Sequence, residues 1–212
     1  MELHQPHILY ESNRHIVNFH TNVKFTPARY CDVWNFWDDS SAPEAKRWRP
    51  GMLAIQQIIR DAENRNMPVR ALGAGWSLSR AAVTEGCLLN TKPLNVIEVG
   101  MRPEHCEQTF LSDLRNTEGK NPTDFLVFAQ CGATIAELNQ ELEPRGLALI
   151  TSGASNGQTI CGAISTGTHG AAWKFGAVHD FIVGFHLISH QGESHWIEPA
   201  SRPVMAKPRF PR

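Results

Sequence analysis

A run of small residues at positions 73–77, Gly-Ala-Gly-Trp-Ser, has the composition of an anion-binding loop. It follows Val69–Leu72, an apolar segment whose pattern predicts a short buried strand. Glycine adopts positive φ angles and carries no side chain, so successive backbone N–H groups there can converge on one anion. A strand that ends in such a turn is typical of a phosphate site, and the hydroxyls of Ser77 and Ser79 follow directly.

A second stretch of small polar residues lies at 151–159, and its hydroxyls and amides are free to bind a ligand. Residues 160–165 are small and apolar, which predicts a tight helical turn beneath this loop. Residues 166–170, Thr-Gly-Thr-His-Gly, are again rich in glycine and hydroxyl groups. The chain therefore carries two separate loops with ligand-binding character.

Histidines and cysteines are the other residues that could do chemistry. His4, His7, His15 and His20 are near one another in the sequence, but the pattern offers no carboxylate or cysteine at ligand spacing, so we expect no metal. The cysteines are odd in number, widely spaced and without a C-x-x-C pair: Cys31, Cys87, Cys106, Cys131 and Cys161. Such cysteines favour buried free thiols in a reducing compartment, which predicts a cytoplasmic protein.

Composition and charge exclude some classes of partner. The 212 residues are 42% hydrophobic, which is enough for one globular domain or two small subdomains. A formal net charge of −1 argues against a nucleic-acid or anionic-membrane partner, because both attract a basic face. There is no N-terminal apolar region of a signal peptide and no long apolar run, so we expect neither export nor membrane insertion.

Periodicity predicts the elements that position the two loops. An amphipathic helix is expected over 52–63, and a second helix should start at the capping box of Thr134 and Glu137 and end at 144–146. The predicted strands are Val69–Leu72, Cys87–Asn90, 94–99, 125–131 and a hairpin of 181–188 with Ser194–Ile197. Partial alternation suggests short strands at 16–20 and 22–25, an aromatic core wedge at 32–37, and a long excursion with a short helix at 101–124.

A nicotinamide-binding Rossmann unit is one alternative for the first loop. It requires G-x-G-x-x-G and a crossover helix, whereas Leu78 occupies the third glycine position. The segment 80–86 is also expected to be too short for the crossover connection that a parallel neighbouring strand needs. The sequence therefore disfavours NAD(P) as the ligand.

Two motifs instead carry a resemblance to a known family. VRALGAGWSLS, from Val69 to Ser79, is similar to the FAD-binding domain of the vanillyl-alcohol-oxidase or p-cresol-methylhydroxylase (PCMH) type. GQTICGAISTGTHG, from Gly157 to Gly170, resembles the flavin-pocket stretch of sugar-lactone and alditol oxidases. The resemblance implies an α+β fold of two α/β subdomains with mixed sheets, and FAD as the cofactor.

The resemblance also assigns contacts with FAD to individual residues. The first loop would wrap the FAD pyrophosphate with backbone amides: Gly73, Ala74, Gly75, Trp76 and Ser77. The second would contact the pyrophosphate and the flavin: Ala154, Thr159, Gly162, Thr166, Gly167, Thr168 and His169.

Two positions bear on how the flavin is attached. Many relatives carry a histidine in this turn that bonds covalently to the flavin ring, and Trp76 stands in its place. An indole N–H is a donor without a usable lone pair, so FAD should be held non-covalently. Cys161 does not stand where the bicovalent relatives place their cysteine, and we expect it to lie in the core.

The family pattern predicts the domain limits. Residues 1–47 would be an N-terminal extension, 48–198 an FAD-binding domain with subdomains of about 48–124 and 125–198, and 199–212 a tail. Family members continue into a substrate domain, so the chain is expected to be truncated before it, with the second subdomain incomplete and no catalytic residue to assign.

The predicted function is that of an FAD-binding module of an oxidoreductase. Its relatives act on CH–OH groups of sugar-acid lactones or polyols. The alternative is a non-catalytic FAD-binding relic or interaction domain, in which a second chain covers an exposed face.

Overall fold

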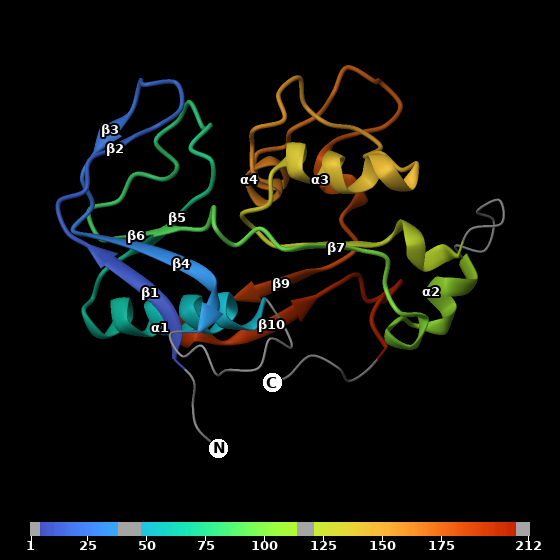
Figure 1. Ribbon diagram of the computed structural model, residues 1–212, viewed down its shortest axis with the longest axis horizontal. Coiled ribbons are helices and arrows are strands. Elements are labelled where there is room, and N and C mark those ends of the chain that lie inside the picture. The colour runs from blue at the N-terminus through green and yellow to red at the C-terminus, as the bar shows by residue number, and fades with distance from the viewer. Residues whose placement is uncertain (1–4, 38–47, 114–120, 207–212) are drawn as a thin grey trace.

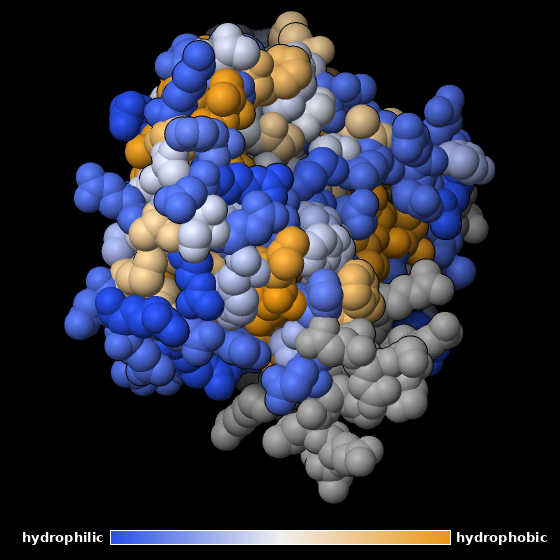
Figure 2. Space-filling view, turned by 60° about the vertical axis from the view of Figure 1, so that its left-hand side comes forward, coloured by the Kyte–Doolittle hydropathy of each residue, from blue (hydrophilic) through white to orange (hydrophobic). Residues whose placement is uncertain are grey.

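The computed structural model describes residues 5–37, 48–113 and 121–206. Two parts lie side by side, one built from residues 5–37 and 49–90 and the other around residues 127–165, and the segment that follows residue 90 leads from the first part to the second (Figure 1). On the face over the first part, hydrophilic residues dominate and hydrophobic atoms show in small separate patches (Figure 2).

The bounds of the elements are as follows. The strands are β1 (Pro6–Glu11), β2 (Ile16–Val17), β3 (Lys24–Phe25), β4 (Arg29–Trp37), β5 (Val69–Leu72), β6 (Cys87–Asn90), β7 (Ile97–Val99), β8 (Val127–Ala129), β9 (Phe185–Ile188) and β10 (Ser194–Ile197). The α-helices are α1 (Arg49–Asn64), α2 (Gln108–Asp113), α3 (Ile135–Leu142) and α4 (Ile160–Ser165). The 3₁₀ helices are η1 (Pro103–His105), η2 (Pro122–Phe125), η3 (Glu143–Arg145), η4 (Val178–Phe181) and η5 (His190–Gly192).

The largest sheet is mixed and has the strand order β1-β4-β6-β5. Strand β1 runs antiparallel to β4, whereas β4 and β5 both run parallel to β6. This mixed sheet, together with three two-stranded antiparallel sheets and the packed helices, confirms the predicted α+β class.

The parallel pairing of β5 with β6 corrects the prediction that residues 80–86 are too short for a crossover. Val69 lies opposite Cys87 and Leu72 opposite Asn90. The whole segment 73–86, glycine turn included, makes the connection without any helix, and such a length is sufficient for a crossover. The case against a Rossmann unit therefore rests on Leu78 and on the missing helix.

The N-terminal residues supply half of the main sheet. The aromatic segment at 32–37 belongs to strand β4 instead of forming a core wedge, because its side chains alternate between the two faces of the sheet. Val33 is buried, whereas Phe36 keeps 49% of its surface exposed. Strands β2 and β3 are shorter than expected, because Thr21 adopts a φ of 59° in the turn between them.

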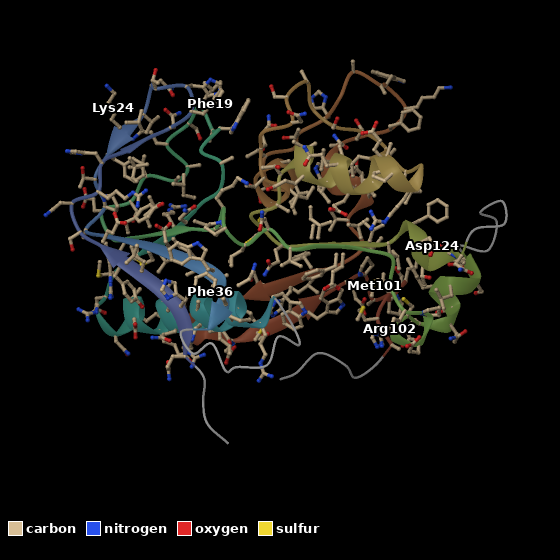
Figure 3. The ribbon with its side chains drawn as sticks, viewed as in Figure 1. Phe19, Lys24, Phe36, Met101, Arg102 and Asp124 are labelled. Atoms are coloured by element: carbon tan, nitrogen blue, oxygen red, sulfur yellow. The ribbon has the colours of Figure 1, made fainter. Side chains whose placement is uncertain are left out.

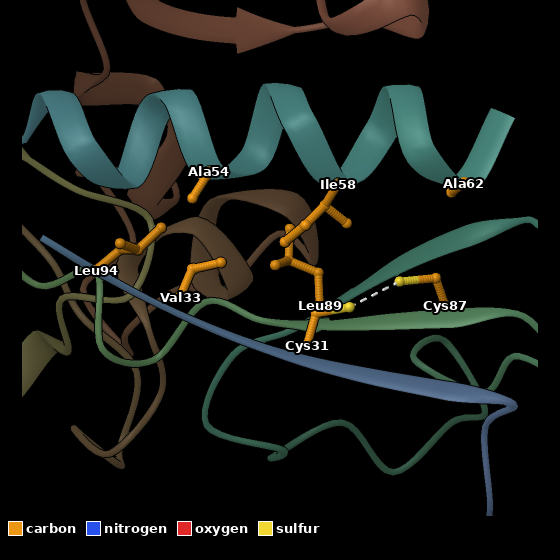
Figure 4. Packing of buried hydrophobic residues seen from close by; sticks show 8 residues of the cluster. All are labelled: Cys31, Val33, Ala54, Ile58, Ala62, Cys87, Leu89 and Leu94. Carbon is orange, nitrogen blue, oxygen red and sulfur yellow. Dashed lines mark hydrogen bonds between the residues drawn. The ribbon is translucent and has the colours of Figure 1, made fainter. Parts of the chain in front are cut away.

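Helix α1 covers one face of this sheet. Pro50 stands in its first turn, where no backbone N–H is required. Ala54, Ile58 and Ala62 recur on the buried side and pack on Val33 and Leu89 (Figure 4). The 3.6-residue period predicted from the sequence is thus confirmed.

The second part is built on α3 and α4. The capping box is confirmed: Thr134 Oγ1 accepts from the Glu137 N–H at 3.1 Å, and the Glu137 carboxylate accepts from the Thr134 N–H at 2.7 Å. The strand expected at 125–131 is reduced to β8, which pairs antiparallel with β7, because η2 precedes it.

The chain returns to α1 at its end. Strands β9 and β10 form the predicted antiparallel hairpin, but β9 is shorter than the expected strand at 181–188, because η4 extends to Phe181. The Gln56 side chain donates to the Gly192 carbonyl at 2.7 Å. Beyond this hairpin, Val204 is buried with Phe110 of α2. Among the described residues, no helix is both long and apolar enough to cross a membrane.

Candidate functional site

The first loop leaves the sheet at the end of its edge strand β5. The Leu72 carbonyl accepts from both the backbone N–H and the hydroxyl of Thr91, at 2.9 and 3.1 Å, which fixes where the loop begins. Gly75 has a φ of 69°, a conformation that other residues rarely adopt. Within the described part of the chain, none of the backbone N–H groups of residues 73–77 donates to a protein acceptor.

The second loop is held by the N-terminal end of α3. The N–H groups of Ile135 and Ala136 donate to the carbonyls of Gln158 and Asn156, at 3.0 and 2.8 Å. Thr159 then caps α4, with its hydroxyl accepting from the Gly162 N–H at 3.3 Å. These two loop carbonyls are therefore hydrogen-bonded to α3, and the conformation of the second loop depends on this helix.

The two loops meet at two points. A methyl group placed on Gly73 would overlap the hydroxyl oxygen of Thr159, so the backbone of the first loop touches the cap of α4. A methyl group on Gly157 would lie 2.5 Å from Cζ2 of Trp76. The absence of a side chain at both glycines is what allows this close approach.

Of the remaining predicted residues, 166–169 follow the C-terminal end of α4, whereas Ala154 lies in the loop before it. The Thr166 hydroxyl donates to the Gly162 carbonyl at 2.9 Å and lies 3.5 Å from the Thr168 hydroxyl. His169 is exposed, and its Nδ1 lies 3.0 Å from the Gly170 carbonyl. Ala154 is also exposed, and Gly167 takes a φ of 67°. Direct contact with the first loop is thus made by Thr159, while these residues extend the second loop along α4.

Two kinds of residue at this site were missed from the sequence. Gln158 Oε1 is buried and has no hydrogen-bond donor among the described residues. The motif GQTICG contained this glutamine, but its residue type alone did not separate it from an ordinary loop position. Phe19 stacks on Trp76 with ring centroids 3.9 Å apart and planes 8° apart, and nothing in the sequence pairs these residues.

The prediction that Cys161 lies in the core is wrong, because this residue is exposed. Helix α4 has a single buried side, formed by Ile160 and Ala163, and Cys161 falls on the other side. The surrounding protein atoms still raise the pKa of its thiol. Cys131, by contrast, is half-buried, and burial together with nearby Cys161 raises its pKa to about 12.

These residues fit FAD as a ligand. The free N–H groups of residues 73–77 can donate to a diphosphate, which is an acceptor only. The orphaned Gln158 Oε1 can accept from an N–H or hydroxyl of the same ligand. Among residues 5–37, 48–113 and 121–206, there is no group of three or more histidine, cysteine or acidic side chains that could hold a metal ion.

Sequence comparison finds relatives that are named as lactone oxidases and lactone dehydrogenases. A Neurospora crassa protein named provisionally as a D-arabinono-1,4-lactone oxidase is 32% identical over 179 residues, which cover 83% of this chain and 28% of the relative. The L-gulono-1,4-lactone dehydrogenase of Mycobacterium tuberculosis strain H37Rv is 28% identical over 163 residues, or 76% of this chain and 33% of the relative. The chain thus spans about a third or less of the length of these relatives.

Comparison of structures supports the fold. The crystal structure of 6-hydroxy-D-nicotine oxidase from Arthrobacter nicotinovorans superposes with a TM-score of 0.62 at 16% identity, over 95% of this chain and 37% of the oxidase. A family model described as FAD binding domain matches residues 52–198. This match covers both glycine-rich loops and confirms the resemblance that their motifs predicted: the chain belongs to the FAD binding domain family.

Proposed function

We propose that this chain is the FAD-binding module of an oxidoreductase that acts on a CH–OH group of a sugar-acid lactone or polyol. The observation that carries the proposal is the meeting of the two loops, which brings the free N–H groups of residues 73–77 next to the cap of α4. The substrate class follows from the lactone oxidase and lactone dehydrogenase names of the relatives.

The residues of this chain have a binding and orienting role. The backbone of 73–77 would hold the diphosphate, and Thr159 and Gln158 would face the same ligand from the second loop. When bound, the flavin supplies the chemistry, since it can accept a hydride from a CH–OH carbon. The protein's contribution in this chain is to fix the cofactor's position and to surround it with oriented dipoles.

The cofactor is proposed to be held without a covalent bond. Trp76 stands where relatives of this type carry the histidine that links to the flavin, and an indole nitrogen offers no lone pair for such a bond. Its ring is already engaged, with Phe19 against one face and Gly157 at its edge.

Acid precipitation tests the cofactor proposal directly. The purified full chain, incubated with FAD and freed of excess cofactor, should release yellow flavin into the supernatant and leave a colourless pellet. A yellow pellet would show a covalent bond and contradict the non-covalent part of the proposal. A protein that retains no FAD at all, while keeping its folded circular dichroism spectrum, would contradict the binding itself.

A second candidate function is that of an interaction domain, as one exposed apolar face suggests. Phe185, Leu187 and Ile197 lie on the same side of the β9–β10 hairpin, with 46%, 41% and 38% of their surfaces exposed. A second chain covering this face would shield these side chains, and replacing Leu187 by Ser would then weaken the assembly. Turnover of aldonolactones by the chain on its own would refute a purely non-catalytic role.

Residence in the cytosol is also a proposal, and cell fractionation can test it.

A further inference from the structure

The hairpin formed by β2 and β3, residues 16–25, precedes the region that the FAD binding domain model matches. It nevertheless lies against the first loop, and Phe19 is at the end of the hairpin that faces the loops (Figure 3). We infer that this hairpin is a positioning element that sets the geometry of the candidate cofactor loop. The cofactor in this inference rests on the proposed function, whereas the positioning itself does not.

The hairpin binds two backbone carbonyls of the first loop and the carbonyl of Leu78, which follows the loop directly. The bonds are Phe19 N–H to Gly75 O at 2.8 Å, Asn18 Nδ2 to Ser77 O at 2.9 Å, and Asn22 Nδ2 to Leu78 O at 3.0 Å. Each bond comes from a different residue of the hairpin, so the loop is held over its length and not at a single point.

These bonds determine where the loop presents its donors. In a trans peptide, the N–H of the next residue points opposite to the carbonyl. Binding of the carbonyls by the hairpin therefore turns the N–H groups of Trp76, Leu78 and Ser79 away from it. The first loop lies between the hairpin and the second loop, as the contact of Gly157 with Trp76 shows.

Phe19 also positions the Trp76 ring. The two rings stack with centroids 3.9 Å apart, and His20 meets the indole edge-on at 6.0 Å. Because the indole also abuts Gly157, its position contributes to the spacing of the two loops. Phe19 keeps 57% of its surface exposed, so its role in the core is small.

The hairpin tip is organised by hydrogen bonds between its own residues. The Asn18 N–H donates to the Val23 carbonyl at 3.1 Å, and Asn18 Oδ1 accepts from the Val23 N–H at 3.0 Å. The Asn18 amide also donates to Asn22 Oδ1 at 2.7 Å, and the Thr21 N–H donates to the Asn18 carbonyl at 3.0 Å. The tip is therefore stabilised by its own hydrogen bonds in addition to those it makes with the loop.

FAD titration of the full chain tests the inference with matched variants. Phe19→Leu and Asn22→Ala should each weaken the dissociation constant for FAD by about tenfold, which corresponds to ~1.4 kcal/mol. Phe19→Tyr keeps the stacked ring and should restore binding to within about twofold. Phe36→Leu is the control, because Phe36 is a similarly exposed phenylalanine on β4. Wild-type affinity in both Phe19→Leu and Asn22→Ala, at unchanged melting temperature, would overturn the inference.

A second measurement on the FAD-free chain separates this inference from the proposed function. With 5-fluorotryptophan incorporated, the ¹⁹F resonance assigned through Trp76→Phe should move in Phe19→Leu, since the stacked ring is lost. Phe36→Leu should leave that resonance in place and shift that of Trp34, whose ring centroid lies 6.0 Å from Phe36. A Trp76 resonance unaffected by Phe19→Leu would refute the positioning role, whereas a wild-type chain that binds no FAD would refute only the proposed function.

Discussion

At the scale of single residues, Gly73 is under the tightest constraint in the site. A Cβ added to Gly73 would overlap the Thr159 hydroxyl oxygen, so the site leaves no room for a side chain. Thr159 cannot simply rotate away, because its hydroxyl caps α4. The close approach of the two loops therefore depends on the absence of one methyl group.

We predict that Gly73→Ala weakens FAD binding by about tenfold or more, because relieving the overlap costs ~1–3 kcal/mol and moves the loops apart. The measurement is a fluorescence titration with FAD. Gly100→Ala is a suitable control: its φ of 85° makes alanine strained, but nothing lies within 4 Å of the added carbon. The control should lose some stability and keep its affinity; a Gly73→Ala variant that binds like wild type would contradict the contact.

The positions of the two loops could be predicted from residue type alone, whereas their role in binding stays a prediction. Glycine at the turn and threonine at a helix cap are local signals that need no knowledge of distant contacts. Phe19 could not be found in this way, since its role depends on Trp76, which is remote in sequence. The misplacement of Cys161 has the same origin: a six-residue helix has too short a pattern to reveal its buried side.

At the scale of elements, the start of α3 links the two parts of the molecule. Besides closing the capping box, Glu137 accepts from Asn95 Nδ2 at 3.0 Å and lies 3.4 Å from Lys92 Nζ. Desolvation opposes ionisation, but the Thr134 N–H and hydroxyl, Asn95 and Lys92 outweigh it and lower the pKa of Glu137 to about 2.

We predict that Glu137 makes stability depend on pH between about 4.5 and 2. The folded pKa is depressed, so the unfolded chain binds more protons in this window and stability is lost as the pH falls through it. Above pH 5 the stabilisation is complete, and Glu137→Gln should remove ~1 kcal/mol there, because the carboxylate is partly exposed.

Urea unfolding at pH 7 and pH 3 provides the measurement. The loss of stability between the two pH values should be smaller in Glu137→Gln than in wild type. Glu141→Gln, an exposed position on the same helix, should change stability by less than ~0.5 kcal/mol. Equal pH dependence in Glu137→Gln and wild type would contradict the assignment.

Elements with a local signal were predicted well, and those that depend on partners were not. Helix α1 has its own periodicity, and α3 has its own cap and stop. Strand β1 has no sequence pattern of its own, because it is defined by its pairing with β4. The lengths of β7 and β8 likewise depend on how far the two strands can pair.

At the scale of the whole molecule, α1 is the element that joins the beginning and end of the chain. It packs on the first sheet and binds the turn between β9 and β10. Gly192 is buried with a φ of 67°, and an added carbon would lie 2.7 Å from Arg60 Nε and 2.8 Å from the Gln56 carbonyl.

We predict that Gln56→Ala lowers the free energy of unfolding by ~1–2 kcal/mol, since it leaves the buried Gly192 carbonyl without its donor. Urea denaturation with an unchanged slope would measure this loss. Gln57→Ala on the next position of α1 removes a side chain that has no hydrogen bond within the described chain, and it should leave stability nearly unchanged. Equal effects of the two substitutions would mean that the hairpin is not held by this bond.

The topology of the whole molecule was only partly readable from the sequence. The family motifs did not reveal the parallel β5–β6 pair, because a loop without a helix makes the crossover. Hydrogen bonds between residues far apart in the sequence, such as that of Gln56 with Gly192, cannot be predicted from the local pattern of residue types.

The central claim is that both loops enclose one diphosphate. The most direct test is a titration of the ¹⁵N-labelled chain with FAD, observing the backbone amides of Gly73–Ser77 and of Thr159–Thr168 by NMR. We predict that both groups shift together with a single dissociation constant, and that NADH shifts neither. Shifts confined to one loop, or equal responses to NADH and FAD, would contradict a shared FAD site.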